Sequence, residues 1–420
     1  MTMTHVRSLA DWIDHNAHAV SLDADAPLDD LEPMRDLVGG ARVVAIGESA
    51  HYIPEFHVVR HRLLRFLVER LGFTIYALEA PFTTGRAIGR WIEQGDGDIG
   101  EIASAAMPIS LGRIPELHDT LAWIREHNLH AERPIHFVGT DVPGSGGSIV
   151  PALERVHAEL STADPDAVPL VDRALELARA HHDDETFAML ARYATVPASE
   201  QDELSAILSR LLGRLESMAA HLDTLGGEAQ STRLDLRGAW YADHLHRDVA
   251  GRGLPGAAAS RDAFMAEVVL DQLDRRPDQR IVVASHNVHI QKVPSSESPA
   301  GQLPQGCHLA AALGAEYRAI AITGREGRTA QIQMNPERPH GFEIQEVPLT
   351  PAPDDSLDAH LSGSGPLMLT DLRHAPDGAA PHRMRMEGYF LDLPVLDAFD
   401  AAAWVPRTSV SAAVSGTGSP

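Results

Sequence analysis

Four short apolar runs in the sequence are each followed by ionisable side chains. The runs occupy residues 42–47, 73–78, 134–139 and 280–285. In open parallel sheets, ligands bind outside the carboxyl ends of the strands. The side chains that follow the runs therefore mark one candidate active-site edge, made of Glu48, His51, Glu79, Asp141, His286 and His289.

Histidine is the residue type in this set that can move a proton near neutral pH. An imidazole titrates near pH ~6.5 and can take a proton from water. A neighbouring carboxylate fixes its tautomer and stabilises the imidazolium. His51 directly follows the first run, and Glu48 and Glu79 are placed to supply that carboxylate.

A metal site is the alternative use of the same side chains. The spacing His51-x-x-x-Glu55 and His286-x-x-His289, joined by carboxylates, could hold a divalent ion. The sequence has no H-E-x-x-H motif. We expect no cofactor, and a divalent metal held by His51, Glu79, His286 and His289 stays open.

Familiar nucleophile and nucleotide motifs are missing from the sequence. It has no G-x-S-x-G elbow and no GxxxxGK[ST] loop, which argues against a serine α/β-hydrolase and a P-loop NTPase. Cys307 is the only cysteine, so disulfides within the chain and multi-cysteine metal sites are excluded. The glycine-rich segment 144–147 lacks dinucleotide-binding spacing and is interpreted as a loop at the active-site rim. A cleft-facing role for His244 is left open.

The apolar runs predict the elements that must position these side chains. Runs of this length, with a fifth at 317–323, are typical of strands buried on both faces. Residues 57–71 have helical periodicity, and Gly72 stands where a helix C-cap belongs. Alternating strands and helices predict an α/β fold with a wound, mainly parallel central sheet flanked by helices.

The remaining chain divides by composition. Residues 151–253 are rich in Ala, Leu, Arg and Glu with helical spacing, which predicts an α-helical insertion or lid. We expect residues 1–150 and 254–405 to form the two parts of the α/β core, with Ser260 as the N-cap of a helix to residue 273. Residues 406–420 are expected to be a disordered tail.

The charge balance narrows the choice of partners. The 420 residues include 35 basic and 59 acidic side chains, for a formal net charge of −24. So negative a chain is unsuited to nucleic acid or to an anionic membrane surface. No apolar stretch is long enough for a membrane helix and no signal peptide is evident. We expect a cytoplasmic protein with a small-molecule partner; the oligomeric state is left unknown.

Several segments, in order, resemble the erythromycin esterase family, which includes erythromycin esterase-like and succinoglycan biosynthesis-related proteins. The resemblance spans residues 41 to about 323. The matching segments are Gly-Glu-Ser-Ala-His at 47–51 with Glu55, Arg-His-Arg-Leu at 60–63, Gly-Phe at 72–73, Ala-Leu-Glu-Ala at 77–80, Arg-Asp-Ala-Phe-Met-Ala at 261–266, Ser-His-Asn-Val-His at 285–289 and Leu-Gly-x-x-Tyr at 313–317.

The resemblance implies a hydrolase that opens a macrolactone or another carboxylic ester without a serine nucleophile. It implies that His51 is the general base for water, oriented by Glu48 or Glu79. Arg60, His286 and His289 would then bind the carbonyl oxygen or protonate the leaving alkoxide. The substrate-binding candidates are Arg261, Asp141, Glu55 and His244.

Two other functions stay open at this point. The same His and Glu cleft could serve natural-product biosynthesis, as a tailoring enzyme that catalyses elimination, cyclisation or acyl transfer on a polyketide-like substrate. The cleft could also be a non-catalytic binding site for a small molecule or a metal. The number of titratable groups argues against the binding function, because binding alone would not require so many.

Overall fold

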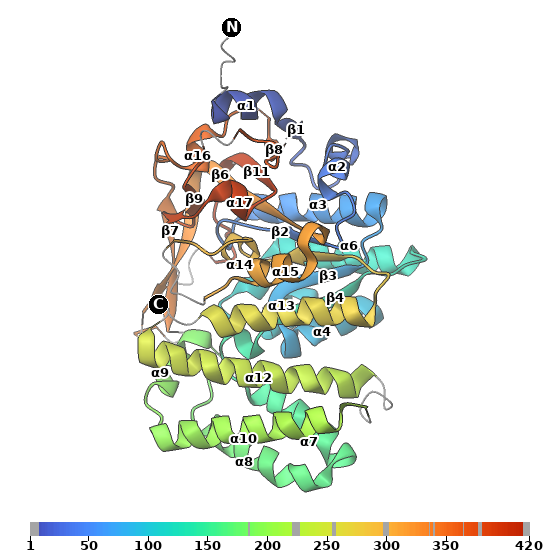
Figure 1. Ribbon diagram of the computed structural model, residues 1–420, viewed down its shortest axis with the longest axis vertical. Helices are drawn as coiled ribbons and strands as arrows, with labels where there is room; N and C mark the ends of the chain where they lie inside the picture. Colours follow the sequence, from blue (N-terminus) through green and yellow to red (C-terminus); the bar gives the residue numbers. More distant parts are fainter. Residues whose placement is uncertain are drawn as a thin grey trace.

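One twisted, largely parallel sheet forms the centre of the protein (Figure 1). The computed structural model describes residues 8–183, 185–220, 227–253, 258–296, 302–335, 337–338, 341–363, 365–376 and 380–414. Within them the strand order is β1-β8-β11-β6-β2-β5-β3-β4, and β7 pairs with β6. The bounds are β1 His18–Val20, β2 Val43–Ile46, β3 Ile75–Pro81, β4 His136–Asp141, β5 Ile281–Ala284, β6 Tyr317–Met334, β7 Phe342–Pro348, β8 Leu367–Asp371 and β11 Ala401–Thr408.

The five predicted apolar runs form β2 to β6, and these strands pair in parallel with one another and with β11. β8 and β1 continue the sheet in the antiparallel sense. The predicted fold class is thus confirmed. β6 continues well past residue 323, because its second half pairs with β7 as an antiparallel ribbon beyond the central sheet.

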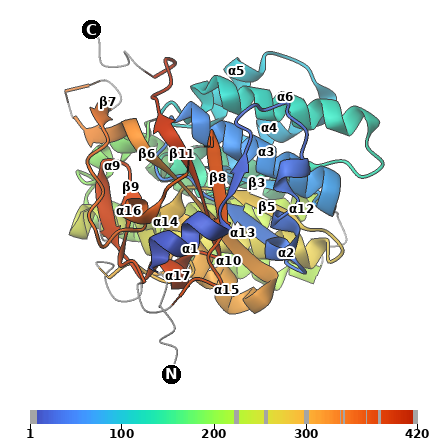
Figure 2. The ribbon, with the colours of Figure 1, turned by 90° about the horizontal axis from the view of Figure 1, so that it is seen from above.

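Helices cover both faces of the sheet because alternate strand residues point to opposite sides. Val44 and Ile46 of β2 pack with α3 (Pro54–Leu71) in one core cluster, whereas Val43 and Ala45 pack with α13 (Ala258–Arg275) in another. α4 (Phe82–Gln94), α5 (Ile99–Ala106) and α6 (Pro115–His130) join α3, and α15 (Gln305–Leu313) joins α13. Figure 2 shows these two groups on either side of the strands.

Of the two helix boundaries predicted from capping residues, one is confirmed and one is not. α3 ends where predicted, because Gly72 adopts a positive φ of 72° and donates its N–H to the Val68 carbonyl. The prediction that Ser260 is an N-cap is wrong. α13 already begins at Ala258, so Ser260 lies inside the helix. Alanine is the strongest helix former, and the alanines before Ser260 extend the helix through it.

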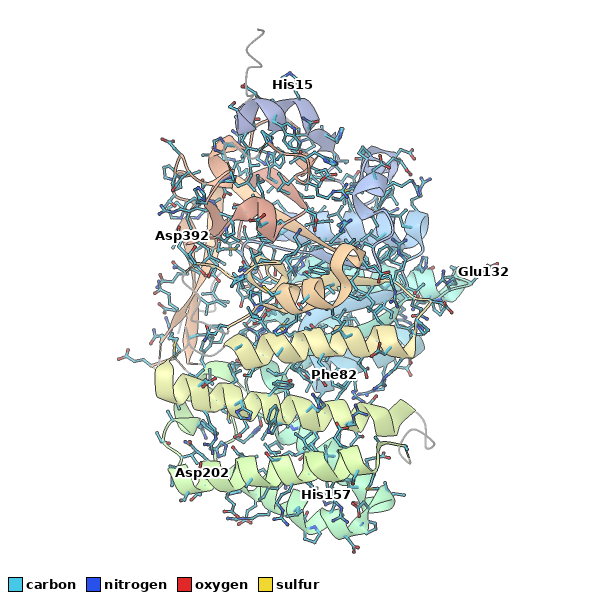
Figure 3. All side chains as sticks on the ribbon, viewed as in Figure 1. His15, Phe82, Glu132, His157, Asp202 and Asp392 are labelled. Carbon is cyan, nitrogen blue, oxygen red and sulfur yellow. The ribbon has the colours of Figure 1, made fainter. Side chains whose placement is uncertain are left out.

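A layer of helices lies beyond α13, on the side away from the sheet (Figure 1). It comprises α7 (Val150–Ala163), α8 (Val168–Ala180), α9 (Thr186–Tyr193), α10 (Ala198–Ser217) and α12 (Gly227–Arg252). Phe82, which is labelled in Figure 3, lies where this layer contacts the core. Its ring meets that of Phe264 edge to face, with ring centroids 6.2 Å apart. The segment predicted to be helical is helical; the domain boundaries themselves stay a prediction.

The C-terminal segment is more ordered than predicted. Residues to 408 belong to β11, Ser409 donates to the Glu55 carboxylate, and the Ser411 N–H donates to the Tyr52 carbonyl. The prediction of a disordered tail is therefore wrong up to Val414, and the rest lies outside the described residues. In the described part of the chain, no helix is long and apolar enough to cross a membrane.

Candidate active site

The polar strand ends meet because β2, β5, β3 and β4 are neighbours in the sheet. Glu48 and His51 follow β2, Glu79 lies near the end of β3, and the 285–289 segment follows β5. A cavity of about 280 Å³ lies at this edge. Its polar wall includes His51, Glu79, Arg261, His286, His289 and Glu387, and its apolar wall includes Ile109, Phe187, Leu190, Leu245 and Val249.

His51 is held by a buried acid. Its Nδ1 lies 2.7 Å from Glu48 Oε1, and the second carboxylate oxygen lies 3.0 Å from Arg60 Nη1. Burial would raise the pKa of Glu48, but Arg60 and His51 outweigh it and lower that pKa to about 2. Burial would lower the pKa of His51, but Glu48 raises it above its ordinary value. An ionised Glu48 therefore holds the Nδ1–H of a basic imidazole.

Arg60 supports this arrangement from within the protein. Its Nε donates to the Gly47 carbonyl at 3.0 Å, and Nη2 donates to the Ser285 carbonyl at 2.5 Å. The guanidinium of Arg60 also pairs with Glu48, so it is occupied by groups of the protein. Arg60 does not line the cavity. The structure therefore does not place Arg60 in the cavity wall, where a contact with the carbonyl oxygen or the leaving alkoxide would require it. The hydrogen bonds of Arg60 instead join the segment before His51 to the end of β5.

Glu79 is the centre of a second network. Its Oε2 accepts from Ser285 Oγ and from the His286 N–H, both at 2.7 Å. Its Oε1 lies 3.0 Å from Arg261 Nη2 and 3.3 Å from His289 Nε2. Burial would raise the pKa of Glu79, but His289 and Arg261 hold it well below its usual range. Both oxygens are thus committed to donors of the protein.

His289 lies between two carboxylates. Its Nδ1 is 2.7 Å from Asp262 Oδ1, and its Nε2 faces Glu79. Burial would lower the pKa of His289, but Asp262 and Glu79 raise it to about 10. The imidazole is therefore a cation at neutral pH and places a fixed positive charge in the cavity wall.

His286 has the opposite protonation state. Its Nδ1 accepts from the Val288 N–H at 3.3 Å, which assigns the proton of the neutral ring to Nε2. Burial, and then the nearby His51, lower the pKa of His286 to about 3. Its buried Nε2 has no hydrogen-bond partner among the described residues. A neutral N–H donor is thus left without a partner beside the cavity, 5.1 Å from the His51 ring between centroids.

Asp141 lies behind the cavity as an anchor for Arg261. Its oxygens accept from Arg261 Nε at 2.8 Å and Nη2 at 2.7 Å, and Oδ1 also accepts the Val142 N–H. Asp141 is fully buried, whereas Arg261 reaches the cavity. Of this predicted substrate-binding pair, only the arginine is placed to meet a ligand.

Two predicted binding residues lie elsewhere. Glu55, near the start of α3, accepts hydrogen bonds from Ser409. His244 meets Trp240 edge to face, with ring centroids 4.3 Å apart, and does not line the cavity. Neither residue is brought to the cavity wall with the other predicted site residues. The next residue, Leu245, is rotated by about 100° around the helix axis and lies in the apolar wall instead.

The predicted metal set does not fit the geometry. Both nitrogens of His289 face carboxylates, and both oxygens of Glu79 accept hydrogen bonds from the protein. Across the described ranges, no group of three or more His, Cys, Asp or Glu side chains is arranged to hold a metal ion. The ligand lone pairs of this set are therefore not aimed at one point.

Three contributors to the site were not predicted from the sequence. Asp262 orients His289, Ser285 binds Glu79, and Glu387 reaches the cavity from the C-terminal part of the chain. Asp262 and Ser285 stand beside predicted site residues inside motifs 261–266 and 285–289, and that adjacency was an available signal. Glu387 has only the local signal of a Glu-Gly pair between two short strands.

The fold and this cluster define a wound α/β enzyme whose active-site edge is built from histidines and ionised carboxylates. The chain belongs to the erythromycin esterase family, whose model matches residues 68–408, and it is a hydrolase of that family. The resemblance noted in the sequence is thereby confirmed.

Two relatives from Escherichia coli cover nearly the whole chain. Erythromycin esterase type II is 33% identical over 401 residues, 93% of this chain and 95% of that protein. Erythromycin esterase type I is 27% identical over 397 residues, 90% and 93% of the two chains.

Solved structures agree with the fold. A histidine-to-asparagine mutant of the erythromycin esterase EreC, in its open conformation, matches with a TM-score of 0.85 and 25% identity over 95% of this chain and 99% of that one. A succinoglycan biosynthesis protein matches with a TM-score of 0.76 and 18% identity over 96% and 97%.

Proposed function

We propose that the protein hydrolyses a carboxylic ester with His51 as the general base for water. The carrying observation is the 2.7 Å contact between His51 Nδ1 and the buried, ionised Glu48. With Nδ1–H committed to Glu48, Nε2 is the nitrogen available to the cavity. An imidazole oriented in this way can accept a proton from water while the carboxylate stabilises the resulting cation.

The remaining side chains suit the charges of ester hydrolysis. Water adds to the carbonyl carbon as His51 Nε2 takes one of its protons, and the carbonyl oxygen becomes an oxyanion. The unpartnered Nε2–H of His286 is a donor for that oxyanion, supported by the cationic His289 and Arg261. The His51 imidazolium then gives its proton to the departing alkoxide, which yields an acid and an alcohol.

The substrate class follows from the relatives and the cavity together. The two relatives are named erythromycin esterases, so we propose a macrolactone or another bulky ester as substrate. The cavity beside His51 is small for such a ligand, since the pockets that bind drug-sized molecules measure about 300–1,000 Å³. A second hollow of about 390 Å³ shares Ile109 with it and offers room for the remainder of a large ester.

Mass spectrometry of the purified protein with a panel of macrolides and simpler lactones tests this function. The wild type should give a product heavier by one water, and His51→Asn should give none. His61→Asn is the matched control, because His61 is buried against Thr120 and does not line the cavity. Retained turnover in His51→Asn would show that His51 is not the general base.

Three further outcomes of this experiment distinguish the other functions. Loss of hydrolysis with a chelator would favour a divalent metal site. Binding of lactones with no mass change would favour a non-catalytic protein. A product formed without added water would favour a tailoring enzyme with a water-excluding site.

A further inference from the structure

Glu387 occupies an unusual backbone position at the cavity. β9 (Arg383–Met386) and β10 (Tyr389–Asp392) form a hairpin in which Met386 pairs with Tyr389, so Glu387 and Gly388 are its two loop residues. Glu387 has a φ of 51°. The first residue of such loops has a positive φ and is ordinarily Gly, Asn or Asp, whose side chains tolerate that region. Here the side chain is a glutamate, with glycine only at the second position.

This loop is attached to the segment that carries His51. The N–H of Glu387 donates to the Ser49 carbonyl at 2.6 Å, two residues before His51. Residues held in sparsely populated backbone regions cluster where the conformation has a use. The hairpin therefore fixes Glu387 relative to the proposed base, although 336 positions separate Glu387 from His51 in the chain.

Glu387 belongs to the wall of the cavity that holds the proposed base. The residue is partly buried, and it lines the same cavity as His51. No ion pair or hydrogen bond of its carboxylate is formed with the described residues. The other titratable or charged groups of the cavity wall are Glu79, Arg261, His286, His289 and Tyr389, and Glu48 lies behind His51.

The charges of Glu387 and His51 also influence each other's pKa. Burial raises the pKa of Glu387, and His51 opposes that rise. Conversely, Glu387 is among the groups that raise the pKa of His51, after Glu48 and Glu79. The first two carboxylates are engaged by donors of the protein, whereas that of Glu387 is free to bind a water molecule in the cavity.

We propose that Glu387 is a catalytic carboxylate that holds the attacking water against His51. The inference rests on the proposed ester hydrolysis. One proton of the water passes to His51 Nε2 as the oxygen bonds to the ester carbon, while the other hydrogen donates to Glu387 and turns the lone pair toward the substrate. Glu387 remains ionised throughout, and His51 carries the proton to the leaving alkoxide.

Two substitutions separate this function from a structural one. Glu387→Gln keeps the shape and removes the charge, and should lower kcat about 10- to 100-fold with KM little changed. Glu387→Gly removes the side chain and suits the positive φ, so this variant should unfold at a higher temperature and still be slow. Glu343→Gln, on β7 and outside the cavity, is the control and should match the wild type.

The pH dependence gives a second readout. The base works unprotonated, so kcat/KM falls below the pKa of His51. Removing the Glu387 charge lowers that pKa, and the acid limb should move to lower pH in Glu387→Gln. Nuclear magnetic resonance titration of the His51 ring in the substrate-free protein should show the same downward shift.

The outcomes distinguish this inference from the proposed function. Normal kcat in Glu387→Gln with an unmoved His51 titration would overturn the role of Glu387 and leave ester hydrolysis standing. Wild-type protein that hydrolyses no ester would overturn the proposed function, and with it the catalytic step assigned to Glu387. A lower unfolding temperature in Glu387→Gly together with a fully active Glu387→Gln would reduce Glu387 to a structural residue.

Discussion

Replacing Asp262 by asparagine should lower the pKa of His289, the cationic histidine of the site, so that its imidazole loses its proton at a lower pH. Asp262 Oδ1 accepts from His289 Nδ1 at 2.7 Å and from the Gln305 N–H at 2.8 Å. An asparagine oxygen can accept both hydrogen bonds, so the substitution removes charge and little else. Asp262 is the first of the two groups that raise the pKa of His289 to about 10. We expect that pKa to fall by at least about 2 pH units, or ~3 kcal/mol of charge stabilisation.

The sign of the stability change follows from the direction of the pKa shift. A folded-state pKa of about 10, against 6.5 for an ordinary histidine, stabilises the fold fully below pH 6.5. That stabilisation is lost as the pH rises from 6.5 to 10. In Asp262→Asn the loss should be smaller and complete near pH ~8. The alkaline limb of activity should move down in parallel, because His289 would then be neutral.

The measurements are a titration of the His289 ring by nuclear magnetic resonance and urea unfolding at several pH values. Asp358→Asn is the matched control: Asp358 is also buried and accepts from Thr323 Oγ1 and the Arg385 N–H, but it does not line the cavity. A His289 pKa still near 10 in Asp262→Asn would refute the reasoning, because Glu79 alone would then account for the shift.

Two further substitutions test the positioning of the site. Ser285→Ala deletes the 2.7 Å donor to Glu79 and should cost about 1.5–3 kcal/mol of stability in urea unfolding, with a measurable drop in kcat; unchanged stability and kcat would show that the bond is dispensable. Gly146→Ala adds a Cβ 2.6 Å from Leu245 at a φ of 87°, and should raise KM and destabilise the protein by about 1–3 kcal/mol. Gly213→Ala, which meets no atom within 4 Å, is its control and should not raise KM.

The parts of the fold that follow from local pattern were predictable. Continuous apolar runs identified β2 to β6, because a strand buried on both faces needs side chains such as those of Val43 to Ile46. Since parallel strands present their carboxyl ends at one edge, the runs also predicted that Glu79 and the 285–289 segment lie at the same edge of the sheet.

The misplaced residues depend on distant contacts that no local pattern encodes. The Glu55 carboxylate accepts a hydrogen bond from Ser409, at the start of the C-terminal segment and 354 positions away in the chain. Arg60 is committed to backbone carbonyls, whereas its type alone suggested an oxyanion ligand. Glu387 depends on a hairpin whose strands are only four residues each and were not predicted.

The end of β5 joins the two networks of the site. The Ser285 carbonyl accepts from Arg60, which pairs with Glu48 and so belongs to the His51 network. The Ser285 hydroxyl and the His286 N–H donate to Glu79, which belongs to the His289 network. One residue thus carries an acceptor for the first network and a donor for the second. Because Ile281–Ala284 pairs on both sides within the sheet, the backbone at this joint is fixed, and both proton-handling groups keep one relative position.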